Sequence, residues 1–343
     1  MTMDGFVFGP GPAGRCDEYR VGGGVVDYDA LSGLWRLWYY CRDRELHTRA
    51  PKTLGSGRVA LATSRDGIDW TRCDGPLTHG AVLEPVDDAT AFDSLHLALT
   101  DVTRGAGEWL MWYFGGDSAV RETTSHLGAV KGLGLRIGLA RSPDGIQWTR
   151  APGQEPSGAQ LGFEDDQTYV AWPNVFNDGR RLVMQYTAPD RALDQYATLT
   201  AVCEDGRTWI KTGPLRWLDG PRSWDSTGII TRQVLANPLP IGGRFLMIYT
   251  GTDERHARAI GAATSDDGVG WTHLYDQPIF HVGAPGAWDS LGVAATRLVA
   301  AGDRLHLYYY GFQSLADDDK PRGIGLAVSE DRDLRSLLRV KRP

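Results

Sequence analysis

A seven-residue phrase, SRDGIDW at residues 64–70, recurs along the chain and decides its fold. Further copies are SPDGIQW at 142–148, EDGRTW at 204–209, DDGVGW at 266–271 and a divergent SEDRDL at 329–334. An Asp-Gly pair between two β-rich runs predicts a tight hairpin, because glycine adopts a positive φ without strain. An alternating strand precedes each copy, and an aromatic strand such as Trp35 to Tyr40 lies further upstream. The phrase therefore marks the last turn of a repeating β unit.

An aspartate heads the first strand of each unit, with an aliphatic residue four positions later. These aspartates are Asp17, Asp93, Asp166, Asp225 and Asp289. Five four-stranded units predict an all-β chain folded as a five-bladed β-propeller around a central channel. We expect a single domain over residues 1–343, with approximate blades at 15–75, 90–150, 164–215, 223–276 and 287–340.

Composition excludes several classes of protein. The chain has 343 residues, 42% hydrophobic and 23% charged, with a net charge of −7. An acidic chain argues against nucleic acid as the partner, and no apolar run approaches the ~20 residues that cross a bilayer. Residues 1–14 lack the layout of a secretory signal, so a cytoplasmic location is expected. Four scattered cysteines favour free thiols, and no histidine spacing indicates zinc, so no metal site and no cofactor are expected, while a structural ion in the channel stays open.

Strand direction predicts where a site would form. Long polar loops at 41–57, 115–135 and 311–322 should lie on the face where the five aspartates begin their strands, and such loops commonly carry sites. Clustered carboxylates push their pKa values apart, as acid/base cleavage of a glycosidic bond requires. The alternative is architectural: an Asp-Ser pair at a strand start can cap the backbone. Asp225 and Asp289 have the most repetitive surroundings and fit that alternative best.

The residue three positions after each aspartate varies, which favours a channel lining that shapes a small-molecule ligand. Candidate substrate-binding residues from these positions and from the adjoining loops are Arg20, Asp93, His96, Tyr169, Trp172, Asp289, Arg42, Asp117, Arg121 and Arg255. Arginines can hold a phosphate or carboxylate in a bidentate fork, and Trp172 can stack on a sugar ring. Solvated surface charges, a structural histidine and packing between blades are the corresponding alternatives.

The chain resembles the five-bladed propellers of the β-fructosidase and arabinanase superfamily. These are glycoside hydrolase families 43, 32, 62 and 68, with the family 130 mannoside phosphorylases as relatives. The resemblance rests on the S-x-D-G-x-x-W hairpin, the aromatic second strand and YVAWPNV at residues 169–175. It implies three catalytic carboxylates: Asp17 as base or nucleophile, Asp166 as the residue that tunes the pKa, and Asp225 as general acid.

Two functions follow from this reading. The first is an enzyme that cleaves a small glycoside or sugar-like substrate by carboxylate acid/base catalysis, by hydrolysis or by phosphorolysis. The alternative is a propeller that binds or transforms a small, anionic metabolite without glycoside cleavage. Residues 15–18 read RCDE, unlike the Asn-Asp-Pro-Asn or Arg-Asp-Pro phrases of active glycosidases, and the upper loops are rich in arginine. Both features motivate the alternative, whereas the ring of aspartates under long polar loops favours the enzyme, which is the function we expect.

Overall fold

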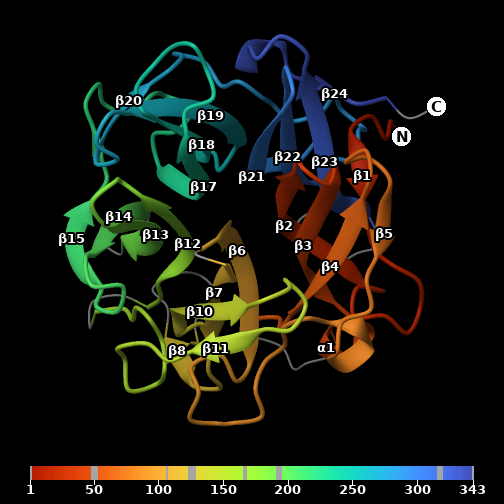
Figure 1. Ribbon diagram of the computed structural model, residues 1–343, viewed down its shortest axis with the longest axis vertical. Coiled ribbons are helices and arrows are strands. Elements are labelled where there is room, and N and C mark those ends of the chain that lie inside the picture. The colour runs from red at the N-terminus through yellow and green to blue at the C-terminus, as the bar shows by residue number, and fades with distance from the viewer. Residues whose placement is uncertain are drawn as a thin grey trace.

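The computed structural model describes residues 2–47, 53–105, 107–122, 129–164, 168–190, 195–314 and 320–341. Within these ranges the strands form five antiparallel blades, each running in chain order from axis to rim (Figure 1). Blade 1 contains β2 (Arg20–Asp29), β3 (Leu34–Arg42), β4 (Arg58–Ser64) and β5 (Trp70–Arg72). Blade 2 contains β6 (His96–Arg104), β7 (Trp109–Gly116), β10 (Leu135–Ser142) and β11 (Thr149–Ala151). Blade 3 contains β12 (Ala171–Asn177), β13 (Leu182–Asp190), β14 (Gln195–Cys203) and β15 (Ile210–Pro214).

Blade 4 contains β17 (Gly228–Ala236), β18 (Phe245–Thr252), β19 (Arg258–Ser265) and β20 (Gly270–His273). Blade 5 contains β21 (Gly292–Ala301), β22 (Arg304–Phe312), β23 (Arg322–Ser329) and β24 (Leu338–Arg339). The remaining elements are short: β1 (Phe6–Phe8), α1 (Arg44–His47), β8 (Val120–Glu122), β9 (Ala129–Lys131), β16 (Arg216–Trp217) and two 3₁₀ turns at Thr78–Gly80 and Leu334–Ser336.

The innermost strands close a ring around the axis. β2 contacts β6, β6 contacts β12, β12 contacts β17, β17 contacts β21, and β21 returns to β2. Each of these strands carries a register shift against its neighbour within the blade, which increases the local twist. The predicted all-β propeller is therefore confirmed. Among the described helices, none is long and apolar enough to cross a membrane.

The repeated phrase forms the turn that its chemistry predicts. In blade 1, Gly67 N–H donates to Ser64 Oγ (2.9 Å), while the N–H groups of Ile68 and Asp69 donate to Asp66 Oδ1 (2.8 Å each). The copy at 142–148 and the copy at 265–270 repeat these bonds. Gly67 has a φ of 74°, a conformation that glycine adopts at no steric cost. Local sequence thus fixes the turn at the bottom face, where the third strand meets the fourth.

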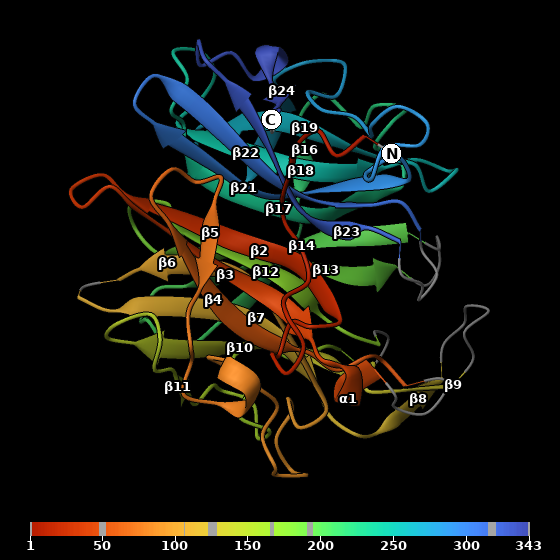
Figure 2. The ribbon, with the colours of Figure 1, turned by 90° about the vertical axis from the view of Figure 1, so that its right-hand side faces the viewer.

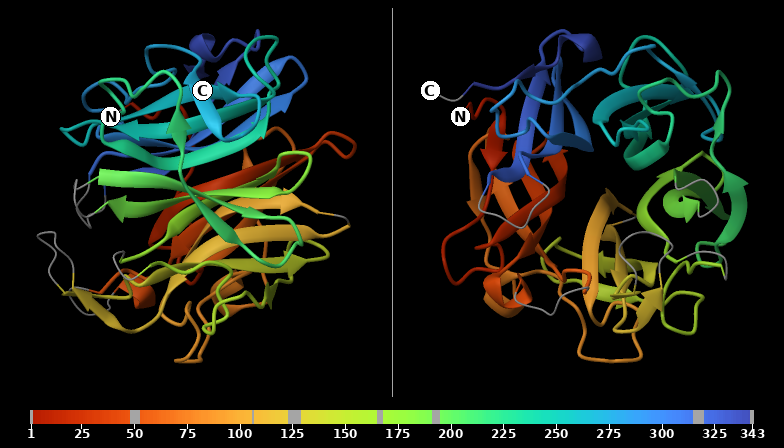
Figure 3. Two further views of the ribbon diagram at one scale, coloured as in Figure 1. Left: turned by 90° about the vertical axis from the view of Figure 1, so that its left-hand side faces the viewer. Right: turned by 180° about the vertical axis from the view of Figure 1, so that it is seen from behind.

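Blade 5 is completed by both ends of the chain. β1 pairs with β23 at Ile324 and Gly325, and β24 pairs with β23 at Ala327 and Val328. The N- and C-terminal segments consequently lie together at the rim of this blade (Figures 1 and 2), as the view from behind also shows (Figure 3). Pairing the first strand with the last blade closes the ring and removes an open sheet edge.

Aromatic side chains of the second strands pack between neighbouring blades. Trp38 lies 4.8 Å from Trp109 between blades 1 and 2, and Trp112 lies 5.6 Å from Trp209 between blades 2 and 3 (ring centroids). Trp38 is fully buried. Burial of rings this large supplies much of the energy that holds blade to blade.

Candidate functional site

Four of the repeated aspartates are held in a common buried arrangement, here called the Asp hub. In blade 1, Asp17 Oδ2 accepts hydrogen bonds from Tyr39 Oη (2.9 Å) and Arg72 Nε (2.6 Å). The other hubs are Asp93 with Tyr113 and Arg150, Asp225 with Tyr249 and His273, and Asp289 with Tyr309 and Arg339. These four aspartates are at most 3% exposed. Each hub joins a strand start to the second and fourth strands of the same blade.

The hubs correct the expectation that the aspartates gather at the channel mouth. Their partners lie on the second and fourth strands, and Asp93, Asp225 and Asp289 each pack against a glycine of the second strand, so these carboxylates are buried within their own blades. Arg72 also donates to the Gly9 carbonyl, and Arg150 (Nη2) to the Glu84 carbonyl (2.6 Å), which ties each hub to the preceding chain. Catalytic roles for Asp17 and Asp225, and substrate-binding roles for Asp93 and Asp289, stay predictions that these contacts do not favour.

Blade 4 replaces the hub arginine with His273. Its Nε2 lies 2.9 Å from Asp225 Oδ2 and its Nδ1 lies 3.0 Å from Asp219 Oδ1. Burial opposes the charged imidazole, but the hydrogen bonds to Asp225 and Asp219 outweigh burial and raise the pKa of His273. A protonated His273 can therefore serve the role that arginine has in the other hubs.

Blade 3 departs from this pattern. The carboxylate paired with its fourth strand is Glu164, which forms an ion pair with Lys211 and whose side chain is 62% exposed. The hydroxyl of Tyr186, on the second strand, has no hydrogen-bond partner among the described residues, and burial together with the Glu164 charge raises its pKa. Phe163-Glu164 thus corresponds to Phe92-Asp93. The predicted spacing of four residues between the acidic residue and the aliphatic residue of the first strand does not identify Glu164, because blade 3 has extra residues between Glu164 and Val170. Asp166, the third predicted catalytic residue, lies outside the described residues, as does Asp165.

A different set of side chains surrounds the top of the channel, where the innermost strands begin. We call it the mouth cluster: Arg20, Tyr40, Arg42, His96, Phe114, Tyr169, Trp172, Tyr196, Arg258, Tyr310 and Phe312. All five blades contribute, because strand starts and second-strand ends meet on this face. Of the predicted binding residues, Arg20, Arg42, His96, Tyr169 and Trp172 belong to it.

Ring contacts connect the first three blades across the mouth. His96 lies 6.4 Å from Tyr40 and 5.9 Å from Phe114, and Phe114 lies 5.5 Å from Trp172 (ring centroids). Tyr169 lies 6.2 Å from Trp172. Trp172 has a φ of 50°, which is strained for a non-glycine residue and is often found at functional sites. The rings form a continuous wall across blades 1 to 3, in which His96 and Phe114 are buried and Tyr40, Tyr169 and Trp172 are half-buried.

Arginines occupy the two ends of this wall. On blade 1, the Arg42 guanidinium lies 5.5 Å from the centre of the Tyr40 ring. On the opposite side, Arg258 lies 5.4 Å from the centre of Phe312, and Phe312 lies 5.6 Å from Tyr310. Burial lowers the pKa of Arg258, and the nearby Tyr196 and Tyr310 hydroxyls only partly offset it. A partly desolvated guanidinium binds an anion more strongly than one in water.

His96 is the most buried polar residue of the mouth cluster, with 5% of its surface exposed. Its Nδ1 lies 2.6 Å from the Gly55 carbonyl oxygen, so Nδ1–H donates and Nε2 carries the lone pair. Burial, and then the positive charge of Arg42, lower the pKa of His96 to about 4. His96 is therefore a neutral hydrogen-bond acceptor near pH 7.

The described part of the mouth cluster contains three arginines and no carboxylate. Neighbouring acids are already paired: Asp117 Oδ2 lies 3.3 Å from Arg136 Nη1, and Asp43 is bonded to Arg58. Arg121 stacks over Phe163 (4.9 Å), and Arg255 is exposed in the turn after β18. The structure thus does not bring Asp117, Arg121 or Arg255 to the mouth cluster through any contact among the described residues.

Sequence reasoning missed the mouth residues on the second and third strands, namely Tyr40, Phe114, Tyr196, Tyr310 and Phe312. The signal was available, because each lies where the second strand ends or the third begins on the top face. The prediction from sequence covers only the starts of the first strands and the adjoining loops.

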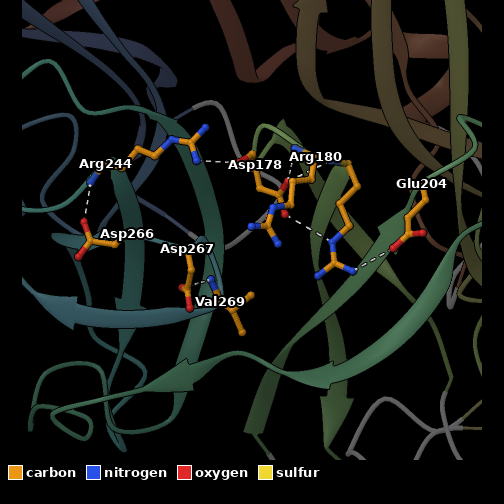
Figure 4. Close-up of a pocket in the computed structure, with 8 residues that line it drawn as sticks. Asp178, Arg180, Glu204, Arg244, Asp266, Asp267 and Val269 are labelled. Atoms are coloured by element: carbon orange, nitrogen blue, oxygen red, sulfur yellow. Dashed lines mark hydrogen bonds and ion pairs between the residues drawn. The ribbon is translucent and has the colours of Figure 1, made fainter.

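The bottom face carries a charged pocket of about 820 Å³ between blades 3 and 4 (Figure 4). Its side chains pair with one another: Arg181 bonds Asp178 and Glu204, and Arg244 donates to the Asp178 carbonyl. Asp178, Arg181, Glu204 and Arg244 therefore already have partners in the hairpins that line the pocket. Across the described ranges, no group of three or more His, Cys, Asp or Glu side chains could hold a metal ion.

Part of the chain is similar in sequence to curated proteins. No family model matches the sequence. Two curated relatives, uncharacterized proteins from two strains of Mycobacterium tuberculosis (CDC 1551 and H37Rv), are each 32% identical over 127 residues. The match covers 36% of this chain and 40% of either relative, so it spans well under half of their length.

Solved structures match nearly the whole chain at low identity. A β-1,2-mannobiose phosphorylase from Listeria innocua is 15% identical, covering 94% of this chain and 93% of its own, with a TM-score of 0.63. A glycosyl hydrolase from Bacteroides ovatus is 16% identical, covering 95% and 91%, with a TM-score of 0.62. A third structure comes from the GH130 family of mannoside phosphorylases, which contains glycoside hydrolases that target β-1,2 mannosidic linkages in Candida mannan. It is 17% identical, covering 95% of this chain and 92% of its own, with a TM-score of 0.64. The chain has the propeller fold of glycoside hydrolases and mannoside phosphorylases.

Proposed function

We propose that this protein is a carbohydrate-active enzyme that binds a sugar ring and an anion together in the mouth cluster. The observation that carries the proposal is the composition of that cluster, in which aromatic rings lie beside the partly desolvated guanidinium of Arg258. Aromatic rings stack on the apolar face of a sugar, and arginines hold phosphate. The cluster suits a glycoside plus inorganic phosphate, or a sugar phosphate.

Phosphorolysis fits this composition better than hydrolysis. A hydrolase needs two carboxyl groups, about 5–9.5 Å apart, at the scissile bond. In phosphorolysis an oxygen of phosphate attacks the anomeric carbon, the glycosidic C–O bond breaks, and one general acid protonates the leaving oxygen. Arg258 would hold the phosphate, and neutral His96 would accept a hydrogen bond from a sugar hydroxyl. Asp166, three residues before Tyr169 in sequence, is our candidate for the acid.

A second candidate function is binding or conversion of an anionic metabolite without glycoside cleavage. The observation that favours it is the sequestration of Asp17 and Asp225 in hubs, since the resemblance to glycosidases assigned these residues to catalysis.

The test is an assay of the purified protein on β-1,2-mannobiose and other disaccharides, with and without inorganic phosphate. We expect turnover that requires phosphate and releases a sugar phosphate. Asp166→Asn should abolish it, while Glu164→Gln, the matched change two residues away, should retain it. Turnover in water alone would identify a hydrolase instead. Stabilisation by sugar phosphates with no turnover on any disaccharide would support the second candidate.

A further inference from the structure

Arg232, on the innermost strand of blade 4, is buried without a carboxylate partner. It is 5% exposed and points toward blade 3. Nη1 donates to the Trp172 carbonyl (3.3 Å) and Nη2 donates to Thr187 Oγ1 and to the Ile230 carbonyl (3.4 Å), whereas Nε has no partner among the described residues. Arg58, a comparably buried arginine, instead bonds both Asp43 and Glu84. Arg232 therefore brings an uncompensated charge into the wall of the propeller.

That charge requires a counterion. Burial alone lowers the pKa of Arg232 to about 9, and no neighbouring acid contributes to the shift. Arginine remains protonated near pH 7 even so. A buried cation without an anion is strongly unfavourable, because neutral carbonyl and hydroxyl oxygens replace only part of its hydration.

Further unsatisfied polar atoms lie on the same face of blade 3. Gln185 is fully buried, and neither its Oε1 nor its Nε2 has a hydrogen-bond partner; the Oγ1 of Thr198 also lacks one within the described ranges. Thr187 lies two residues after Gln185 and directly opposite Thr198 in the sheet, so all three share a face. Since Thr187 Oγ1 accepts a hydrogen bond from Arg232, Gln185 and Thr198 lie on the face of blade 3 that this arginine contacts.

A cavity adjoins this patch. It has a volume of about 220 Å³ and is lined by Thr198, Tyr196, Trp217 and Gly228 among others. Gly228 (φ 116°) pairs with Tyr196 across the two blades, and a Cβ at Gly228 would lie 2.2 Å from the Tyr196 carbonyl oxygen. Glycine is thus required where the two blades join beside the cavity. The cavity gives a small ion a route to Thr198.

We propose that the interface of blades 3 and 4 holds a small inorganic anion, bound by Arg232 with Thr198 and the Gln185 amide as further donors. This site is separate from the mouth cluster and does not depend on the proposed cleavage of sugars. Because Arg232 also holds the carbonyl of Trp172, a bound anion would fix the strained backbone that positions Trp172 at the mouth. The wall anion would then support the mouth without touching the substrate.

The direct test is anomalous diffraction from crystals of the full chain soaked in sodium bromide. We expect a bromide peak within hydrogen-bonding distance of Arg232 in the wild type and no peak there in Arg232→Met. Water alone beside Arg232, or a carboxylate of the chain paired with it, would overturn the proposal.

Thermal unfolding provides an independent measurement. Sodium chloride is compared with sodium MOPS, a bulky sulfonate, at equal ionic strength, because an ion that binds only the folded state raises the unfolding temperature. The wild type and Arg207→Met, a control at an exposed arginine outside both sites, should show the same chloride-dependent rise, and Arg232→Met should show a smaller one. Equal responses in all three proteins would contradict the proposal. If Arg232→Met does not fold, Arg232→Lys, which keeps the charge but loses the guanidinium fork, should give a weaker rise. Failure of the phosphorolysis assay would leave these outcomes unchanged.

Discussion

The Asp hubs and the mouth cluster differ in the groups that surround their charged side chains. In a hub, a buried carboxylate is matched by a tyrosine hydroxyl and a cation of its own blade, as Asp93 is by Tyr113 and Arg150. In the mouth cluster, the guanidinium groups of Arg42 and Arg258 lie over aromatic rings. The hub contacts stabilise the blades, whereas the Arg258 guanidinium, beside Phe312 and the Tyr196 and Tyr310 hydroxyls, is the cation that we assign to a ligand. Blade 3 lies between these cases, because its Glu164–Lys211 pair is exposed.

The largest expected effect is the loss of a hub carboxylate. Asp93→Asn should lower the free energy of unfolding by about 3–5 kcal/mol, because Arg150 is left without its counterion. Glu164→Gln in blade 3 should cost about 0–1 kcal/mol, since its ion pair with Lys211 is exposed to solvent. Denaturant titration of the two variants measures the difference. Equal losses would show that the hubs do not differ from the blade 3 pair.

The mouth cluster and the hubs should also differ in the pH dependence of stability, through His96 and His273. The folded pKa of His96 is about 4, below the unfolded value of 6.5, so the unfolded chain binds more protons between these values. The stabilising contribution is present above 6.5 and is lost as the pH falls toward 4. Between about pH 7.5 and pH 5, the wild type should lose about 2 kcal/mol more than His96→Asn, which lacks the titrating ring.

His273 should show the opposite dependence, because its folded pKa is raised. Its contribution is present below the unfolded pKa and declines as the pH rises through the folded value. NMR titration of the two imidazoles checks both directions. A His96 that titrates near 6.5 would remove the basis for treating it as a neutral acceptor.

A smaller effect is expected from removing one hub hydroxyl. Tyr113→Phe should cost about 1.5–2 kcal/mol, because Asp93 loses a hydrogen bond to a charged oxygen. Tyr186→Phe in blade 3 should be nearly neutral, since the Tyr186 hydroxyl bonds no described residue. Guanidinium unfolding of this matched pair tests whether the fourfold hub pattern, rather than tyrosine burial alone, stabilises the blades.

The smallest effect on stability should come from the mouth. Arg258→Met should change the free energy of unfolding by no more than about 0.5 kcal/mol, because a partly desolvated cation with no acidic partner adds little to the fold. Phosphate binding should weaken about tenfold, or about 1.4 kcal/mol. Calorimetric titration with inorganic phosphate measures the second quantity. A stability loss as large as that of Asp93→Asn would assign Arg258 to the architecture.

The hub aspartates show where inference from sequence reached its limit. The recurrence of Asp17, Asp93, Asp225 and Asp289 at strand starts is consistent both with a ring of carboxylates at the channel and with an architectural contact in each blade. Their cationic partners lie 55 residues further on for Asp17 and 57 for Asp93, beyond three intervening turns. Which interpretation holds depends on how far the strand start lies from the axis, and spacing along the chain carries no information on that distance.

Sequence patterns were enough to predict the wheel of blades, because the Asp-Gly hairpin and the alternation of strand residues act within a few positions of one another. They also led to Arg20, Arg42, His96, Tyr169 and Trp172, since strand direction alone sends them to one face. Which charges are neutralised became clear from the folded structure. Each hub pairs residues from different strands of a blade, and Arg232 contacts residues of the neighbouring blade without meeting a described carboxylate. Burial removes water from these groups, so a buried charge is favourable where it has a partner and costly where it has none.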